Sequence, residues 1–254
     1  MKGEFFMARY MDFEYEKIND EIRIKKYCGF AKSVNIPSRI ENLPITEIGV
    51  GAFSDCNSLT IVTIPDSVKE LGFSSFEHCK SLTEISIPNS VIEIGMCAFS
   101  DCISLKNISL SESLKEISIG TFLGCTSLTN IKIPNSVTVI DLSAFEECIS
   151  LKSIDIPDSV TYIGECAFYR CSSLESVTIS NSLTQIATWT FKECSSLTNV
   201  IIPHSVLEIE FGAFESCSSL KNITIPNSAI KIDSDAFWNC KCIDKILTNK
   251  NKFS

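Results

Sequence analysis

A phenylalanine recurs every 23 residues along most of this chain of 254 residues. A cysteine follows three residues after each of these phenylalanines, and a leucine, or isoleucine in the last copy, follows after six. The nine positions are Phe53, Phe76, Phe99, Phe122, Phe145, Phe168, Phe191, Phe214 and Phe237. A fixed period of about 20 to 50 residues is typical of stacked repeats. The sequence therefore predicts a solenoid whose coils bury apolar side chains against neighbouring coils.

Each repeat divides into the same local elements. Residues 52–56 (AFSDC) place apolar side chains three apart, which predicts one short helical turn. Residues 59–64 (LTIVTI) end in an alternating pattern that predicts a strand, and Pro65 ends it because proline cannot donate to a ladder. Residues 68–71 predict a short second strand. Strands one coil apart run in the same direction, so the repeats predict one long parallel sheet.

Two residue types have a positional role in this prediction. Nine of the 13 cysteines share one repeat position, and we expect them to be reduced thiols packed inward as small apolar groups. Reduced thiols favour a reducing compartment. Three repeats have a glycine at the same position, and we expect these glycines to permit a tight bend that closes the coil. They are Gly72, Gly95 and Gly164.

The net charge of −9 and pI of about 4.9 argue against nucleic acid as a partner, because phosphate recognition needs a basic face. No apolar run is long enough to predict membrane insertion. Residues 1–21 show no basic start followed by an apolar stretch, so we expect a cytoplasmic protein. A cell-surface or secreted location is the alternative. The oligomeric state is not predicted.

The inventory of reactive groups predicts no enzyme, no cofactor and no metal site. His78 and His204 occupy different phases, five coils apart. The pair Cys240 and Cys242 has no second pair at zinc spacing. Without a nearby base, no cysteine is an activated nucleophile. The carboxylates that recur at one phase, which we expect to form a solvated charge column, are Glu70, Glu93, Glu116 and Glu208.

The repeat unit resembles the BspA-like class of leucine-rich repeats over about residues 31–247. The pattern is carried by Ile154, Ile156, Pro157, Ser159, Val160, Ile163, Gly164, Ala167, Phe168, Cys171 and Leu174. The resemblance implies a leucine-rich-repeat right-handed superhelix that acts as a binding scaffold, and the family is associated with surface proteins that attach to host proteins and cells. Residues 1–30 are expected to form a capping segment, as a β-hairpin, and residues 248–254 a C-terminal tail.

The outward strand positions form the predicted binding face, for a protein or a glycan ligand. The predicted contact residues are Glu84, Ser86, Asn107, Ser109, Asn130, Lys132, Ser153, Asp155, Ser176, Thr178, Asn199, Asn222 and Thr224. These are mostly hydrogen-bonding side chains, and the aromatic and arginine anchors of tight interfaces are missing. A solvated face without a ligand is the alternative. Trp189 is expected to pack locally or to serve as a contact point, and Trp238 to help cap the last repeat.

Overall fold

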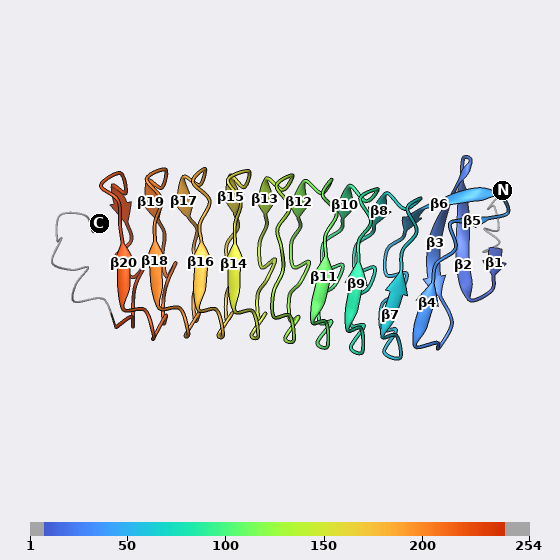
Figure 1. The fold of residues 1–254 in the computed structure, drawn as a ribbon, viewed down its shortest axis with the longest axis horizontal. Coiled ribbons are helices and arrows are strands. Elements are labelled where there is room, and N and C mark those ends of the chain that lie inside the picture. The colour runs from blue at the N-terminus through green and yellow to red at the C-terminus, as the bar shows by residue number, and fades with distance from the viewer. Residues whose placement is uncertain (1–7, 242–254) are drawn as a thin grey trace, which may run out of the picture.

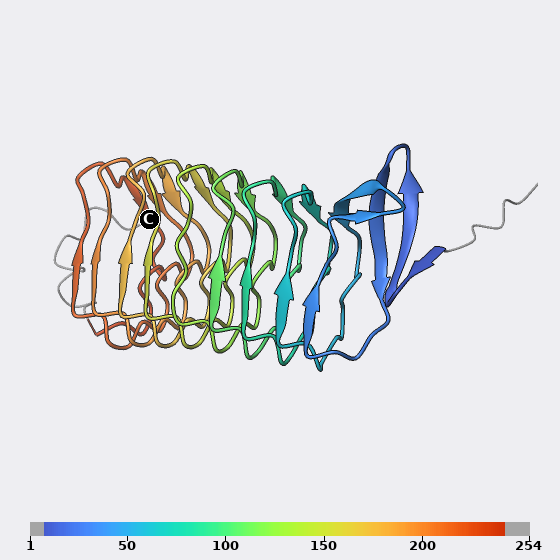
Figure 2. The same ribbon diagram turned by 45° about the vertical axis from the view of Figure 1, so that its right-hand side comes forward.

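The computed structural model describes residues 8–241, which form a solenoid of stacked coils built from strands and turns (Figure 1). Three predicted parts lie outside these residues: residues 1–7 of the cap, residues 242–247 of the repeat region, which include Cys242, and the tail 248–254. Within 8–241 each 23-residue unit makes one coil, and most coils have two strands that lie on different sides of the stack (Figure 2).

The first strand of the coil is three residues long and, in the coils that carry the repeated leucine, begins two residues after it. In every strand of this set the middle residue points into the stack and the two flanking residues are exposed, apart from half-buried middle residues in β16 and β20. These strands are β4 (Ser33–Asn35), β7 (Ile61–Thr63), β9 (Glu84–Ser86), β11 (Asn107–Ser109), β14 (Ser153–Asp155), β16 (Ser176–Thr178), β18 (Asn199–Ile201) and β20 (Asn222–Thr224).

The second strand of the coil follows the proline turn and is two residues long in most coils. Where neighbouring strands of this set pair, they are also parallel and in register, as in β8 and β10, where Glu70 lies beside Glu93. These strands are β6 (Leu43–Ile48), β8 (Glu70–Leu71), β10 (Glu93–Ile94), β12 (Glu116–Ile117), β13 (Val139–Ile140), β15 (Tyr162–Ile163), β17 (Gln185–Ile186), β19 (Glu208–Ile209) and β21 (Lys231–Ile232).

The first set is parallel as predicted, but it does not form one continuous sheet. It divides into β4–β7–β9–β11, β14–β16 and β18–β20, and residues 130–132 form no strand. The coils that precede residues 130–132 and β18 carry buried Ser111 and Ser180 where most other coils have proline. The Ser180 hydroxyl donates to the Val160 carbonyl at 2.6 Å. The strand ladder is therefore interrupted next to the two coils that lack the proline.

The core is a continuous stack of the repeating phenylalanines, each with almost no exposed surface. The rings of Phe145 and Phe168 lie 5.3 Å apart with an angle of 3° between their planes, and the other neighbouring pairs from Phe53 to Phe237 are stacked as well. Aromatic pairs in such contact add about 0.5 to 1.5 kcal/mol to the energy of burial. The predicted inward position of this column is confirmed.

The predicted helical turns are wrong: residues 8–241 contain no helix. Around each phenylalanine, some backbone N–H groups donate to carbonyl oxygens of the same turn, and others donate to carbonyl oxygens of the next coil. Cys148 N–H bonds to the Phe145 carbonyl at 3.2 Å, whereas Phe145 N–H bonds to Ala167 at 2.8 Å. A helix would need all of these groups for its own ladder. The second residue after the phenylalanine also has a positive φ, 59° at Glu147, which ends any helical path.

The glycines at the coil bend have a different role from the predicted one. Gly72, Gly95 and Gly164 are not among the residues with positive φ. Each lies against the backbone of the preceding coil, and a Cβ on Gly95 would meet the Phe73 nitrogen at 2.6 Å. They permit close approach between coils rather than an unusual turn.

The N-terminal end of the stack is covered by antiparallel strands β1 (Ala8–Tyr10), β2 (Phe13–Ile18) and β3 (Glu21–Tyr27), which stand beside the first coil (Figure 2). The Tyr27 ring stacks on Phe53 with centroids 5.2 Å apart, and Phe13 meets Phe53 edge-on. The short strand β5 (Arg39–Ile40) pairs with β6. Aromatic residues of the hairpin thus continue the phenylalanine column and shield its first ring.

Candidate functional site

The predicted binding face lies on the outside of the first strand set, and we call it the first-sheet face. All thirteen predicted residues are exposed there. Eleven lie on strands of the first set, and Asn130 and Lys132 lie in the coil that has no strand of the first set. The register between strands brings equivalent positions side by side, for example Glu84 beside Asn107 and Ser86 beside Ser109. The structure therefore aligns these side chains in two rows along the stack.

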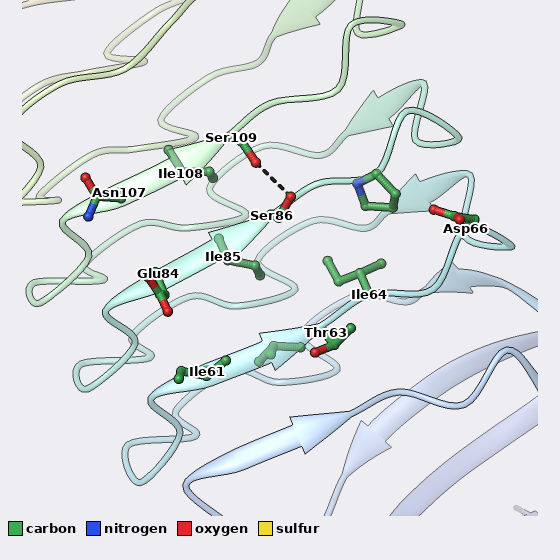
Figure 3. Close-up of a pocket in the computed structure, with 12 residues that line it drawn as sticks. Ile61, Thr63, Ile64, Asp66, Glu84, Ile85, Ser86, Asn107, Ile108 and Ser109 are labelled. Atoms are coloured by element: carbon green, nitrogen blue, oxygen red, sulfur yellow. Dashed lines mark hydrogen bonds between the residues drawn. The ribbon is translucent and has the colours of Figure 1, made fainter.

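Side chains on the first-sheet face also bond to one another from coil to coil. The hydroxyls of Ser109 and Ser86 lie 2.7 Å apart, as Figure 3 shows. Farther along, the Thr178 hydroxyl donates to Asp155 at 2.6 Å, and the Asn222 amide donates to Asn199 at 2.8 Å. Such bonds between exposed side chains restrict their rotamers, which lowers the entropy that their ordering in a contact would cost.

Two apolar residues interrupt this polar surface. Ile201 is 72% exposed at the end of β18, and Ile61 begins β7 at the edge of a shallow hollow. The hollow lies over β7, β9 and β11, and its lining includes Ile61, Glu84 and Asn107 (Figure 3). We did not include either isoleucine among the predicted contact residues, although both occupy outward strand positions that the repeat pattern defines.

A separate column with several titratable residues lies at the second position after the phenylalanines, where Gly124, Ser216 and Asn239 stand in three of the repeats. The imidazole of His78 lies between two carboxylates of adjacent coils, with Nδ1 3.6 Å from Asp55 and Nε2 3.2 Å from Asp101. In the same column Arg170 bridges Glu147 at 2.9 Å and Glu193 at 3.1 Å, and these contacts raise the pKa of its guanidinium. We did not predict these clusters. The 23-residue spacing of the three members of each was the signal available in the sequence.

These groups do not form a nucleophilic site. Both nitrogens of His78 face carboxylates, those of Asp55 and Asp101, rather than a hydroxyl or a thiol. Burial raises the pKa of the Cys125, Cys148 and Cys171 thiols, so these cysteines stay protonated. A thiol attacks only as the thiolate. The cysteine column is therefore suited to packing and not to covalent chemistry.

Of the nine cysteines at the repeat position, eight are buried, as predicted, and Cys56 is half-buried. No group of three or more metal-ligating side chains occurs within residues 8–241. The same part of the chain holds no helix that is long and apolar enough to cross a bilayer.

The two tryptophans lie at different places on the surface. Trp189 packs locally: its ring meets Phe211 edge-on at 6.0 Å, and the Lys192 ammonium lies 5.1 Å from the ring centroid. It also lies against Gly212, where a Cβ would come within 2.5 Å of the indole. Trp238 is an exposed residue of the last described coil, and its predicted capping role stays a prediction.

Comparison with known proteins supports the repeat architecture. A family model described as BspA type leucine rich repeat region, in six copies, matches residues 23–150 and 140–253. The crystal structure of a T. pallidum leucine rich repeat protein is 26% identical, covers 97% of each chain and has a TM-score of 0.61. A leucine rich cell surface protein from Faecalibacterium prausnitzii is 24% identical over 92% of each chain, with a TM-score of 0.44. The search of curated proteins found no match.

Proposed function

Because the chain belongs to the BspA type leucine rich repeat family, we propose that it is a non-catalytic scaffold that recognises a protein through its first-sheet face. The observation that carries this proposal is the alignment of exposed hydrogen-bonding side chains on successive parallel strands, as in Ser86 and Ser109. Such a surface presents donors and acceptors at a regular spacing of about 4.8 Å. A glycan, which also bonds through many hydroxyls, is the alternative ligand.

The exposed isoleucines favour a protein over a glycan. Ile61 and Ile201 offer apolar contact area at two separate places on a polar face. Interfaces between proteins commonly have an apolar centre within a polar rim. The hollow beside Ile61, between β7 and β11, is the place where we expect the centre of the contact.

A peptide library displayed on phage tests this proposal. Selection would use the wild-type chain on beads, and the enriched peptides would then be tested on the variant Ser86→Arg/Ser109→Arg, because two bulky charged groups block the face without touching the core. A matched control is Thr161→Arg, an exposed residue beside the second strand set. We expect enriched peptides to bind the wild type and the control but not the double variant. Peptides that bind all three chains equally would contradict the proposal, and a parallel glycan array tests the alternative.

The compartment is a second part of the proposal. Eight of the nine cysteines at the repeat position are buried in one column, and a column of reduced thiols fits a reducing interior, so we propose a cytoplasmic location. The alternative is an adhesin on the cell surface. Protease treatment of intact cells that express a tagged chain distinguishes the two, because only an exported protein is cleaved before lysis.

A further inference from the structure

A groove runs along the second strand set in the first four coils, and we call it the acidic groove. One wall consists of glutamates on β6, β8, β10 and β12, the other of apolar residues just before the phenylalanine turn, and glycines lie between them. The wall and floor residues are Glu47, Glu70, Glu93, Glu116, Val50, Phe73, Met96, Gly72 and Gly95. This groove lies on a different side of the stack from the first-sheet face.

The glutamate wall carries charge that the described chain leaves largely unpaired. Glu47, Glu70 and Glu93 lie side by side in the strand register. Arg23 pairs with Glu47, whereas Glu70, Glu93 and Glu116 form no ion pair within residues 8–241. Lys115 is the one cation among the residues that line the groove. Burial, with the charges of Glu47 and Glu93, raises the pKa of Glu70. Like charges beside one another destabilise a sheet, and a cationic ligand would relieve this repulsion.

The opposite wall is apolar and exposed to solvent. Val50, Phe73 and Met96 occupy the same position of three successive coils, with 64%, 50% and 48% of their surface exposed. Exposed apolar side chains are normal when they are single, but a contiguous row beside a groove is typical of an interaction site. This row is an observation independent of the glutamates, and both line the same hollow.

The floor between the walls is bare because it consists of glycine. Gly72 lies between Glu70 and Phe73 in the chain, and Gly95 lies between Glu93 and Met96. Close packing of the coils excludes a side chain here, since a Cβ on Gly72 would lie 2.8 Å from the backbone of Gly49 and Val50. The backbone of a bound peptide can therefore lie close to these glycines and run along the axis of the stack.

We propose that the acidic groove binds an extended segment of a partner protein in which cationic and apolar side chains alternate. In an extended chain successive side chains point to opposite sides, so one set would face the glutamates and the other would face Phe73 and Met96. Three strand spacings of about 4.8 Å separate Glu47 from Glu116, and an extended segment of about five residues covers that length. This site is additional to the first-sheet face and does not depend on it.

Fluorescence anisotropy with the purified full chain tests the proposal. The probe is a fluorescein-labelled peptide of five residues that alternates arginine and valine and begins and ends with arginine. Two control peptides replace the valines by serine or the arginines by glutamate. Measurements at about 0.15 M salt suppress long-range attraction to the acidic protein. We expect saturable binding of the first peptide, binding about tenfold weaker of the serine peptide, and no binding of the glutamate peptide.

Variants of the chain place the binding in the groove. Glu93→Gln/Glu116→Gln removes two exposed charges from one wall, and we expect it to weaken binding about tenfold. Phe73→Ser/Met96→Ser should weaken it by a similar factor. The matched control is Glu84→Gln, which removes one exposed charge from the first-sheet face. It should leave binding of the peptide unchanged, and circular dichroism would confirm that each variant is folded.

Several results would overturn the proposal. Equal affinity for the valine and serine peptides would show attraction to net charge alone. An effect of Glu84→Gln as large as that of the groove variants would move the binding to the first-sheet face. Absence of binding by the wild type to the first peptide would remove the site altogether. If Phe73→Ser/Met96→Ser is unfolded, Ile92→Ser, an exposed lining residue of the same groove, replaces it in the comparison.

Discussion

The thiol of Cys148 donates a hydrogen bond to the carbonyl oxygen of Phe122, which lies 26 positions earlier in the sequence, with Sγ and O 3.2 Å apart. The same bond recurs through the stack, from Cys79 with Phe53 to Cys240 with Phe214. Each thiol therefore ties its own coil to the preceding one. The bond requires a protonated sulfur, which connects the stability of the core to pH.

The free energy of unfolding should fall as pH rises above about 8.5, the ordinary pKa of a cysteine thiol. Burial raises the pKa of Cys148 in the folded chain, so the folded state opposes its ionisation while the unfolded state permits it. The stabilisation is complete below the unfolded pKa and is lost at higher pH, by up to about 1.4 kcal/mol per pH unit for each thiol. Urea denaturation between pH 8 and pH 10 measures this slope. Cys148→Ala should show a shallower slope than the wild type, and identical slopes would contradict the assignment.

Phe145→Ala should lower the free energy of unfolding by about 3 to 5 kcal/mol. The ring is fully buried in the middle of the stack, between Phe122 and Phe168, so truncation leaves a cavity and removes two stacking contacts. Chemical denaturation followed by circular dichroism measures the change. Ile149→Ala, at an exposed position four residues later, is the control and should have little effect. A melting temperature of Phe145→Ala equal to that of the wild type would show that the ring is not in the core.

Gly95→Ala should destabilise the chain by about 1 to 3 kcal/mol through overpacking. The added Cβ would lie 2.6 Å from the Phe73 nitrogen and 2.7 Å from the Gly72 carbonyl carbon, and backbone atoms cannot move aside as a flexible side chain can. Thermal unfolding measures the loss. Ile92→Ala changes an exposed residue of the same coil and provides the comparison. Unchanged stability of Gly95→Ala would mean that the coils are spaced more widely.

Tyr27→Ala should cost about 3 kcal/mol and uncover the first ring of the phenylalanine column. Tyr27 is buried and stacks on Phe53, so its loss exposes an apolar surface at the end of the stack. Binding of a hydrophobic dye, together with the melting temperature, reports both effects. Tyr10→Ala removes an exposed ring from β1 and should alter neither. If Tyr27→Ala binds no more dye than Tyr10→Ala, the hairpin does not act as a cover.

The repeat pattern predicted the parts of the fold that each coil determines by itself. Alternation of apolar residues located the strands, and the period located the stacked phenylalanines and the exposed rows that include Ser86 and Ser109. The turn at the phenylalanine was predicted wrongly because its conformation depends on bonds to the next coil, such as that from Phe145 to Ala167. Local sequence does not contain that information.

The acidic groove was missed for a related reason. Glu70, Glu93 and Glu116 were interpreted as a solvated charge column, which describes each of them alone. Their proximity to Phe73 and Met96 follows from the closeness of successive coils, which the bare glycine floor permits. The sequence contained the three columns, but it did not show that they line one hollow.

The unbroken column of stacked phenylalanines also has a consequence for how such a gene can change. Every interior coil meets its neighbours through the same phenylalanine stacking, so an in-frame duplication of one 23-codon unit inserts a coil whose ring fits between the rings of both neighbours. Only the hairpin that covers Phe53 must stay at its end. In a globular protein the exposed area grows more slowly than chain length. Here the two grow in proportion, so each duplication adds a full increment of surface on which new contacts can evolve.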